Sequence, residues 1–197
     1  MMIGKLAWAG VAVATLMSSV PANAGGILGV GTVGSCSFAG KAKIKPGLVL
    51  GGTVTPVVTK VSGKLSGCTG GTGDGSGVVS GKVKGVITST GTNDCLALAT
   101  VGLAGFDLNV KWKSTSAKLL ASTIHVAATP PGSIVLGAAV TITMAGTADA
   151  AGSFGGNAFT ASAITDETVV AFTTACGAKG LKAFNFSGVN GPSTFGL

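Results

Sequence analysis

Apolar and polar side chains alternate along most of this chain with a period of two residues. In the segment 105–113, apolar Phe106, Leu108, Val110 and Trp112 alternate with polar Asp107, Asn109, Lys111 and Lys113. Successive side chains of a β-strand point to opposite faces of the sheet, so this pattern predicts half-buried strands. Long runs of strong helix formers are absent. The sequence therefore predicts an all-β fold.

Segments with this period recur at short intervals. We expect strands at 37–45, 57–66, 78–88, 105–113, 119–128, 133–145, 153–163, 168–175 and 181–187. Turn sequences rich in Gly, Pro and Asp separate them. This spacing predicts an antiparallel sandwich or closed barrel of about nine to ten strands, as a single domain over residues 25–197. Within 78–88, we expect Val79, Val83 and Ile87 to face the core. The tail 188–197 either is loose or adds an edge strand.

The first 24 residues have the pattern of a secretory signal peptide. One positive charge, Lys5, precedes the apolar run 6–17, which is shorter than the roughly 20 residues that a membrane-spanning helix needs. Small residues follow at 22–24, which predicts cleavage after Ala24, with an uncleaved anchor as the alternative. The chain contains no Arg, which favours the general secretory route. No later segment could span a membrane as a helix. We therefore expect a secreted or envelope-associated protein.

Four cysteines, Cys36, Cys68, Cys95 and Cys176, lie beyond this segment, and an even number in an exported chain predicts two disulfides. If successive strands run up and down, Cys68 and Cys95 lie at opposite ends of a strand about 33 Å long, too far apart to bond. This favours Cys36–Cys68 and Cys95–Cys176. A metal site is not expected, because the closest two cysteines in sequence are 27 positions apart.

Catalytic motifs are scarce. The chain has one histidine, His125, and no G-x-S-x-G elbow to present a nucleophilic serine. The six acids lie mostly in predicted turns: Asp74, Asp94, Asp107, Asp149, Asp166 and Glu167. No motif for a cofactor is present, because the Gly-rich segment 70–78 lacks the Lys of a phosphate-binding loop. A secreted hydrolase using His125 or an acid pair is one alternative, and a non-enzymatic domain is the leading hypothesis.

The lysines are distributed unevenly. Residues 25–113 carry nine Lys and three acids, whereas residues 114–197 carry three of each. We expect a positive sheet face built from Lys41, Lys43, Lys60, Lys64, Lys82, Lys84, Lys111 and Lys113. Such a face would attract an anionic envelope polymer or an acidic lipid surface. Alternatively, the lysines only keep the sheet soluble. Nucleic acid is not expected, because the chain lacks Arg and has few aromatic residues.

An oligomeric envelope pore is a further alternative, because alternating segments of about ten residues also occur in membrane barrels. Such barrels carry girdles of aromatic residues at the membrane interfaces. After the predicted cleavage, this chain has no Tyr and one Trp, Trp112. The lysines also lie where a membrane barrel is apolar. Both observations disfavour a pore.

Several short segments carry a resemblance to a group of proteins. These are the sequence 61–68 (VSGKLSGC), Cys95 after a Gly/Thr hairpin, the strand 110–112 (VKW), and Cys176 followed by Gly180-Leu181. With the signal peptide, they resemble small exported four-cysteine, Gly/Thr/Val-rich β-proteins of high-GC Gram-positive bacteria. That group has no assigned activity. The resemblance therefore implies an exported β-domain and no catalytic residue.

Overall fold

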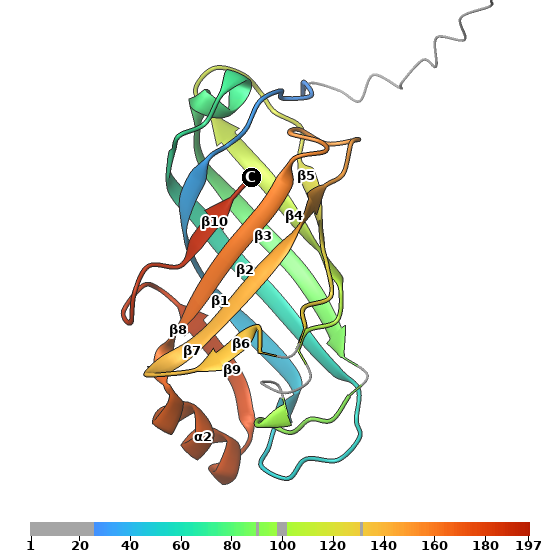
Figure 1. Ribbon diagram of the computed structural model, residues 1–197, viewed down its shortest axis with the longest axis vertical. Coiled ribbons are helices and arrows are strands. Elements are labelled where there is room, and N and C mark those ends of the chain that lie inside the picture. Colours follow the sequence, from blue (N-terminus) through green and yellow to red (C-terminus); the bar gives the residue numbers. More distant parts are fainter. Residues whose placement is uncertain (1–25, 90, 98–101, 131) are drawn as a thin grey trace, which may run out of the picture.

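The computed structural model describes residues 26–89, 91–97, 102–130 and 132–197 (Figure 1). The predicted signal peptide, with its cleavage point at Ala24, lies outside the described residues. Within these ranges, no helix is both long enough and apolar enough to cross a membrane.

The described residues contain ten strands, all paired with one another in antiparallel fashion, which confirms the all-β prediction. They are β1 (Ser35–Leu48), β2 (Val57–Thr69), β3 (Val78–Ser89), β4 (Phe106–Ser114), β5 (Ser122–Val126), β6 (Ile134–Leu136), β7 (Ala139–Ala148), β8 (Ala158–Thr168), β9 (Leu181–Phe186) and β10 (Thr194–Gly196). A 3₁₀ helix, η1 (Gly73–Gly77), precedes β3, and an α-helix, α2 (Val169–Ala178), follows β8. Eight of the strands form a closed barrel, in the order β1-β2-β3-β4-β5-β7-β8-β10 and back to β1 (Figure 1). Of the two predicted architectures, the barrel is correct.

The barrel closes on the second edge of β1, which two short strands share. At its start, residues 35–37 pair with residues 194–196 of β10. Farther along, residues 40–43 pair with residues 183–186 of β9. Strand β10 also pairs with β8, so it connects the last long strand to the first. The tail 188–197 does add a strand, but not the predicted edge strand, because β10 pairs with β1 on one side and with β8 on the other and so closes the barrel.

Side chains, rather than a backbone ladder, join β8 to β9. The Asp166 carboxylate accepts a hydrogen bond from the Ser187 N–H (2.7 Å), and Glu167 accepts one from the Asn185 N–H (3.3 Å). Asn190 donates its amide N–H to the Asp166 carbonyl (2.7 Å). These bonds satisfy polar groups that a regular strand pair would otherwise satisfy.

The predicted inward faces are largely correct. On β1, Phe38, Ala42 and Ile44 are buried, whereas Lys41 and Lys43 are exposed. Val79 is an exception, because it is 41% exposed and its neighbour Val78 is buried instead. The pairing of β3 with β4 shifts register between Val78 and Ser80. Such a shift moves the side chains on one side of it to the opposite face.

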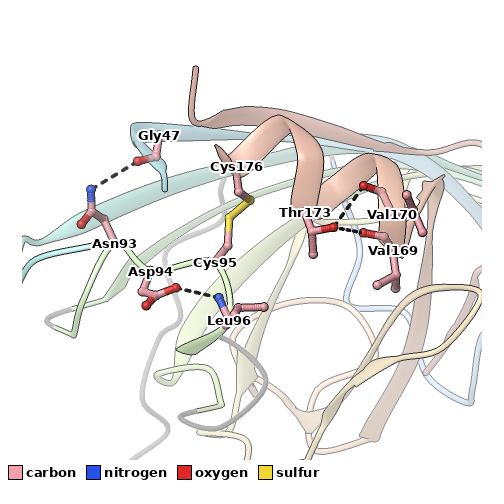
Figure 2. The surroundings of a disulfide bond; sticks show 9 residues. All are labelled: Gly47, Asn93, Asp94, Cys95, Leu96, Val169, Val170, Thr173 and Cys176. Carbon is pink, nitrogen blue, oxygen red and sulfur yellow. Dashed lines mark hydrogen bonds between the residues drawn. A yellow bond between two sulfur atoms is a disulfide. The ribbon is translucent and has the colours of Figure 1, made fainter. Parts of the chain in front are cut away.

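The predicted strand 168–175 is wrong, because this segment is the helix α2. Thr168 caps the helix, its hydroxyl accepting a hydrogen bond from the Ala171 N–H (3.2 Å). Inside the helix, the Thr173 hydroxyl donates to the carbonyls of Val169 (3.0 Å) and Val170 (3.1 Å; Figure 2). The Val- and Thr-rich composition favours a strand locally, and the cap together with tertiary packing overrides that preference.

Two other predicted strands have different limits. The segment 133–145 is a hairpin, in which Ile134 of β6 pairs with Ile142 of β7 around a turn at Gly137. The segment predicted at 153–163 is displaced, since β8 covers 158–168. Its first residues form a turn in which Phe154 has a positive φ of 63°. A period of two does not reveal where a chain reverses, which accounts for both errors.

The two disulfides are Cys36–Cys68 and Cys95–Cys176, which confirms the predicted pairing. The first joins the start of β1 to the end of β2, at the end of the barrel that holds η1. The second lies at the opposite end and ties α2 to the segment 91–97 (Figures 1 and 2).

Replacing Gly63 tests the packing inside the barrel. A Cβ atom at Gly63 would collide with the Phe38 ring and with the Ala39 carbonyl oxygen on the neighbouring strand. We expect Gly63→Val to lower the free energy of unfolding by about 1–3 kcal/mol in a urea titration. Ser66→Val, at an exposed position of the same strand, is the control and should change it by less than about 0.5 kcal/mol. Equal effects of the two substitutions would contradict this packing.

Candidate functional site

The eight lysines predicted to form a positive face lie on four strands that are neighbours in the barrel. Strands β1, β2, β3 and β4 pair in that order, and each carries two of the lysines. All eight are exposed. We call this surface the lysine face; it consists of Lys41, Lys43, Lys60, Lys64, Lys82, Lys84, Lys111 and Lys113.

The strand register places several of these lysines directly opposite one another. Lys64 on β2 pairs with Lys82 on β3, and Lys82 pairs in turn with Lys111 on β4. Lys43 on β1 pairs with Lys60 on β2. Like charges at directly opposite positions destabilise a sheet. The lysine face therefore carries a repulsion that an alternation of Lys with Thr or Ser would avoid.

Among the described residues, none of these lysines forms an ion pair with a carboxylate. In the part of the chain that the structure describes, both ion pairs belong to His125, and neither involves a lysine. The acid nearest to the face in the strand register is Asp107, which lies opposite Val86 on β3 and bonds to His125 on β5. Asp107 lines the groove described below and lowers the field there, and elsewhere on the lysine face solvent and salt screen the charges.

An open groove of about 610 Å³ lies on the lysine face. Its lining includes the small residues Ser62 and Gly85, the acid Asp107, and four lysines: Lys41, Lys43, Lys60 and Lys84. Asn109, which lies opposite Lys84 in the register, adds an amide. A groove with ammonium groups and hydrogen-bonding groups along it can hold an extended chain of anions. The sequence predicted the lysines but gave no sign of the groove, because small residues between lysines look like ordinary strand residues.

His125 lies on the outer surface, on the strand β5 beyond the lysine face. Its Nδ1 atom bonds to Asp107 (2.8 Å) and its Nε2 atom to Asp149 (3.2 Å). Its side chain is 52% exposed. Hydrogen bonds to Asp107 and then Asp149 raise the pKa of His125 above its ordinary value of 6.5. Since each nitrogen faces a carboxylate, the doubly protonated ring fits this site best, and neither nitrogen is left to accept a proton from a serine.

The other acids are engaged with the backbone. Each accepts a hydrogen bond from a main-chain N–H: Asp74 from Val30, Asp94 from Leu96, Asp149 from Ala151, Asp166 from Ser187 and Glu167 from Asn185. The bonds from Ala151 and then His125 lower the pKa of Asp149. Burial pushes the pKa of Asp166 upward, but hydrogen bonds from residues 187–189 outweigh it and lower the pKa. These contacts stabilise turns and, at Asp166 and Glu167, the junction between β8 and β9.

Metal-ligating side chains do not gather into a site. Among the described residues, no group of three or more His, Cys, Asp and Glu is arranged to hold a metal ion. The four cysteines are all used in the two disulfides. No protein-family model, curated protein or solved structure matches the chain.

The His125 bridge predicts a pH-dependent stability. Because the folded-state pKa of His125 is raised, its contribution is fully present below about pH 6.5 and is lost as the pH rises through the folded-state pKa. We expect the difference in unfolding free energy between the wild-type protein and His125→Gln to be larger at pH 5.5 than at pH 9, measured by urea titration. Thr123→Gln, on the same face of β5, should give the same difference at both pH values. A His125→Gln difference that does not change with pH would contradict the bridge.

The repulsion on the lysine face predicts that removing one lysine stabilises the protein. We expect Lys82→Thr to raise Tm by about 1–4 °C in low salt, because it relieves two like-charge contacts and places a good strand former on β3. The gain should shrink in 1 M NaCl, where charges are screened. Lys118→Thr removes the same charge away from the face and should raise Tm less. A lower Tm for Lys82→Thr would contradict uncompensated repulsion.

Proposed function

We propose that this protein is an exported, non-enzymatic binding protein that holds an anionic polymer of the cell envelope along its lysine face. The observation that supports this proposal most is the row Lys64, Lys82 and Lys111, three cations on directly paired positions that form no ion pair within the described part of the chain. A polyanion lying across the row would convert this repulsion into attraction. The groove beside it supplies space for an extended chain.

A soluble polymer fits the lysine face better than a lipid surface does. Proteins that lie on membranes combine basic residues with large apolar side chains that enter the headgroup layer. On strands β1–β4, the exposed large apolar residues are Val79 and Val86, one at the start of β3 and one near its end. They are too few and too far apart to form such a patch.

The arrangement of side chains favours this proposal over the two alternatives. A hydrolase using His125 would need a free ring nitrogen beside a nucleophile, whereas Asp107 and Asp149 engage both nitrogens. A pore of the porin type has an apolar outer wall and a polar lumen. Here the outer wall of β1–β4 carries the lysines and the barrel interior is apolar. The two disulfides support an extracytoplasmic location.

The test is a titration of the protein with two soluble polyanions. Long-chain polyphosphate carries phosphate groups, and polygalacturonate carries carboxylate groups. If four lysines contact the polymer, raising the NaCl concentration from 50 to 200 mM should weaken binding roughly 50-fold. This takes a slope of about −0.7 for each contact in a plot of log K against the logarithm of the salt concentration. We expect the double variant Lys82→Glu/Lys84→Glu to lose at least about tenfold in affinity at 50 mM NaCl.

The matched control is Lys118→Glu/Lys179→Glu, which changes the net charge equally but away from the lysine face. It should lose less than about threefold, since only the long-range field changes. Equal losses for the two double variants, or affinity independent of salt, would refute a localised site. Tight binding to phosphatidylglycerol vesicles without polymer binding would replace the polymer by a lipid surface.

A further inference from the structure

Half of the exposed large aliphatic side chains in the described part of the chain lie at one end of the barrel, the end that carries α2 (Figure 1). Val54 is 79% exposed and Val170 is 73% exposed, so both side chains lie mostly in water. Single exposed aliphatic residues are common on proteins, whereas a group of them marks a contact with another surface. We call this group the apolar end; it consists of Leu50, Val54, Leu96, Val135, Leu136 and Val170.

Three of these residues lie around the start of α2. The N–H of Val169, the first helical residue, donates a hydrogen bond to the Ala138 carbonyl (3.2 Å). Ala138 lies in the short turn between β6 and β7, and this turn follows Val135 and Leu136 directly. The hydrogen bond therefore holds the exposed side chains of β6 beside Val170, in the first turn of the helix.

The other three residues lie around the segment 91–97 and the last turn of α2. Leu96 adjoins the disulfide that ties this segment to the helix (Figure 2). Val54 forms an isolated antiparallel bridge with Thr92 of the same segment. Leu50 lies beside Gly177, since a Cβ atom at Gly177 would be 3.4 Å from the Leu50 Cδ1 atom. The six side chains thus belong to one surface with α2 in it.

The outer side of α2 carries no charge. Its two buried residues are Phe172 and Cys176. Its exposed residues are Val170, Ala171, Thr174, Gly177 and Ala178. A surface helix normally turns charged and polar side chains toward water, and a helix that is apolar all round is covered by protein or by lipid. The outer side of α2 therefore has the composition of a covered surface.

Lysines outnumber acids beside the apolar end. Lys45 near the end of β1, Lys179 at the end of α2 and Lys182 at the start of β9 are all exposed. Two acids lie nearby, and both accept hydrogen bonds from the backbone: Asp94 within its own segment (2.9 Å) and Glu167 from β9 (3.3 Å). Cations beside an apolar patch complement a bilayer that contains acidic lipids, which is anionic at its surface and apolar below it.

The same charges disfavour a second copy of this chain as the partner. A dimer with two-fold symmetry brings the same patch of both copies into contact. Lys45, Lys179 and Lys182 of one copy would then approach those of the other, and like charges repel. At a bilayer, by contrast, each lysine can extend its ammonium group to a lipid phosphate while its methylene groups lie against the apolar side chains.

From these observations, we propose that the apolar end docks on a lipid bilayer that contains anionic lipids. Its six aliphatic side chains enter the headgroup layer, and Lys45, Lys179 and Lys182 contact the lipid phosphates. The lysine face lies on the side wall of the barrel, on β1–β4. Docking by one end leaves that wall open to a polymer, so the two proposals succeed or fail independently.

Cosedimentation with vesicles tests the docking on the protein with both disulfides intact. The vesicles consist of phosphatidylcholine with roughly one third phosphatidylglycerol, an anionic lipid. We expect saturable binding, and binding at least about fivefold weaker to vesicles of phosphatidylcholine alone, since each lysine near an anionic surface contributes roughly a factor of five. No binding, or equal binding to both kinds of vesicle, would overturn the proposal.

Matched variants locate the contact. Val54→Asp/Val170→Asp places two carboxylates at the apolar end and should weaken vesicle binding at least about tenfold. An acid in the first turn of a helix favours the helix, so Val170→Asp does not disrupt α2. The control is Val30→Asp/Val79→Asp, which makes the same changes at exposed valines near η1, at the opposite end. It should weaken binding less than about threefold, and equal losses for the two double variants would refute docking by the apolar end.

A fluorescence measurement reports the contact without adding charge. Val170→Trp keeps the apolar end apolar, and lipids with brominated acyl chains quench a tryptophan that enters the bilayer. We expect stronger quenching in Val170→Trp than in Val79→Trp. Both variants share the signal of Trp112, which packs against Phe154 and Phe195. Equal quenching in the two variants, or none in either, would overturn the proposal.

Comparison with the lysine-face variant separates the two proposals. Lys82→Glu/Lys84→Glu, combined with Val170→Trp, should keep the quenching by brominated lipids, whereas Val54→Asp/Val170→Asp should keep its affinity for polyphosphate within about threefold. Loss of quenching in the first variant would place the lipid on the lysine face and refute docking by the apolar end. A protein that sediments as a dimer, and as a monomer after Val54→Asp/Val170→Asp, would assign the apolar end to a second copy instead.

Discussion

Closure of the sheet on β1 is the interaction on which the rest of the structure depends. Because β10 and β9 divide the second edge of β1 between them, the curved sheet has an inside and an outside. Closure also removes exposed edges, which in an open sheet invite aggregation. The strand that completes it is three residues long, so a short segment of the chain secures the arrangement of all the others.

Each strand of β1–β4 serves two surfaces at once. Its inward residues line an apolar cavity, and its outward residues form a charged wall. The period of two keeps these surfaces chemically separate even though they are only one sheet apart. Small residues contribute on both sides, since Ala42 leaves space inside the barrel and Ser62 lines the groove outside it. A composition rich in small residues thus suits a barrel with open space inside and a groove on its outer wall.

The sequence predicts most of the fold because local pattern and tertiary structure agree along β1–β4. There the inward residues, the outward lysines and the Cys36–Cys68 disulfide follow from alternation and strand direction. It fails where tertiary contacts decide the outcome, as at α2, whose β-branched residues resemble a strand, and at Val79, which a register shift moves outward. The lysines of the candidate site could be predicted singly. Their direct pairing, the groove and the His125 bridge depend on register, which the sequence does not encode locally.

The disulfide Cys95–Cys176 is the covalent link between α2 and the segment that contains Thr92. In a reducing compartment this link is absent, and only noncovalent contacts such as the burial of Phe172 hold the helix against the barrel. The α2 end is therefore fastened covalently only where the two thiols can be oxidised. Reduction of this one bond would loosen the α2 end, whereas the strands β1–β4 at the other surface would keep their hydrogen-bonded register.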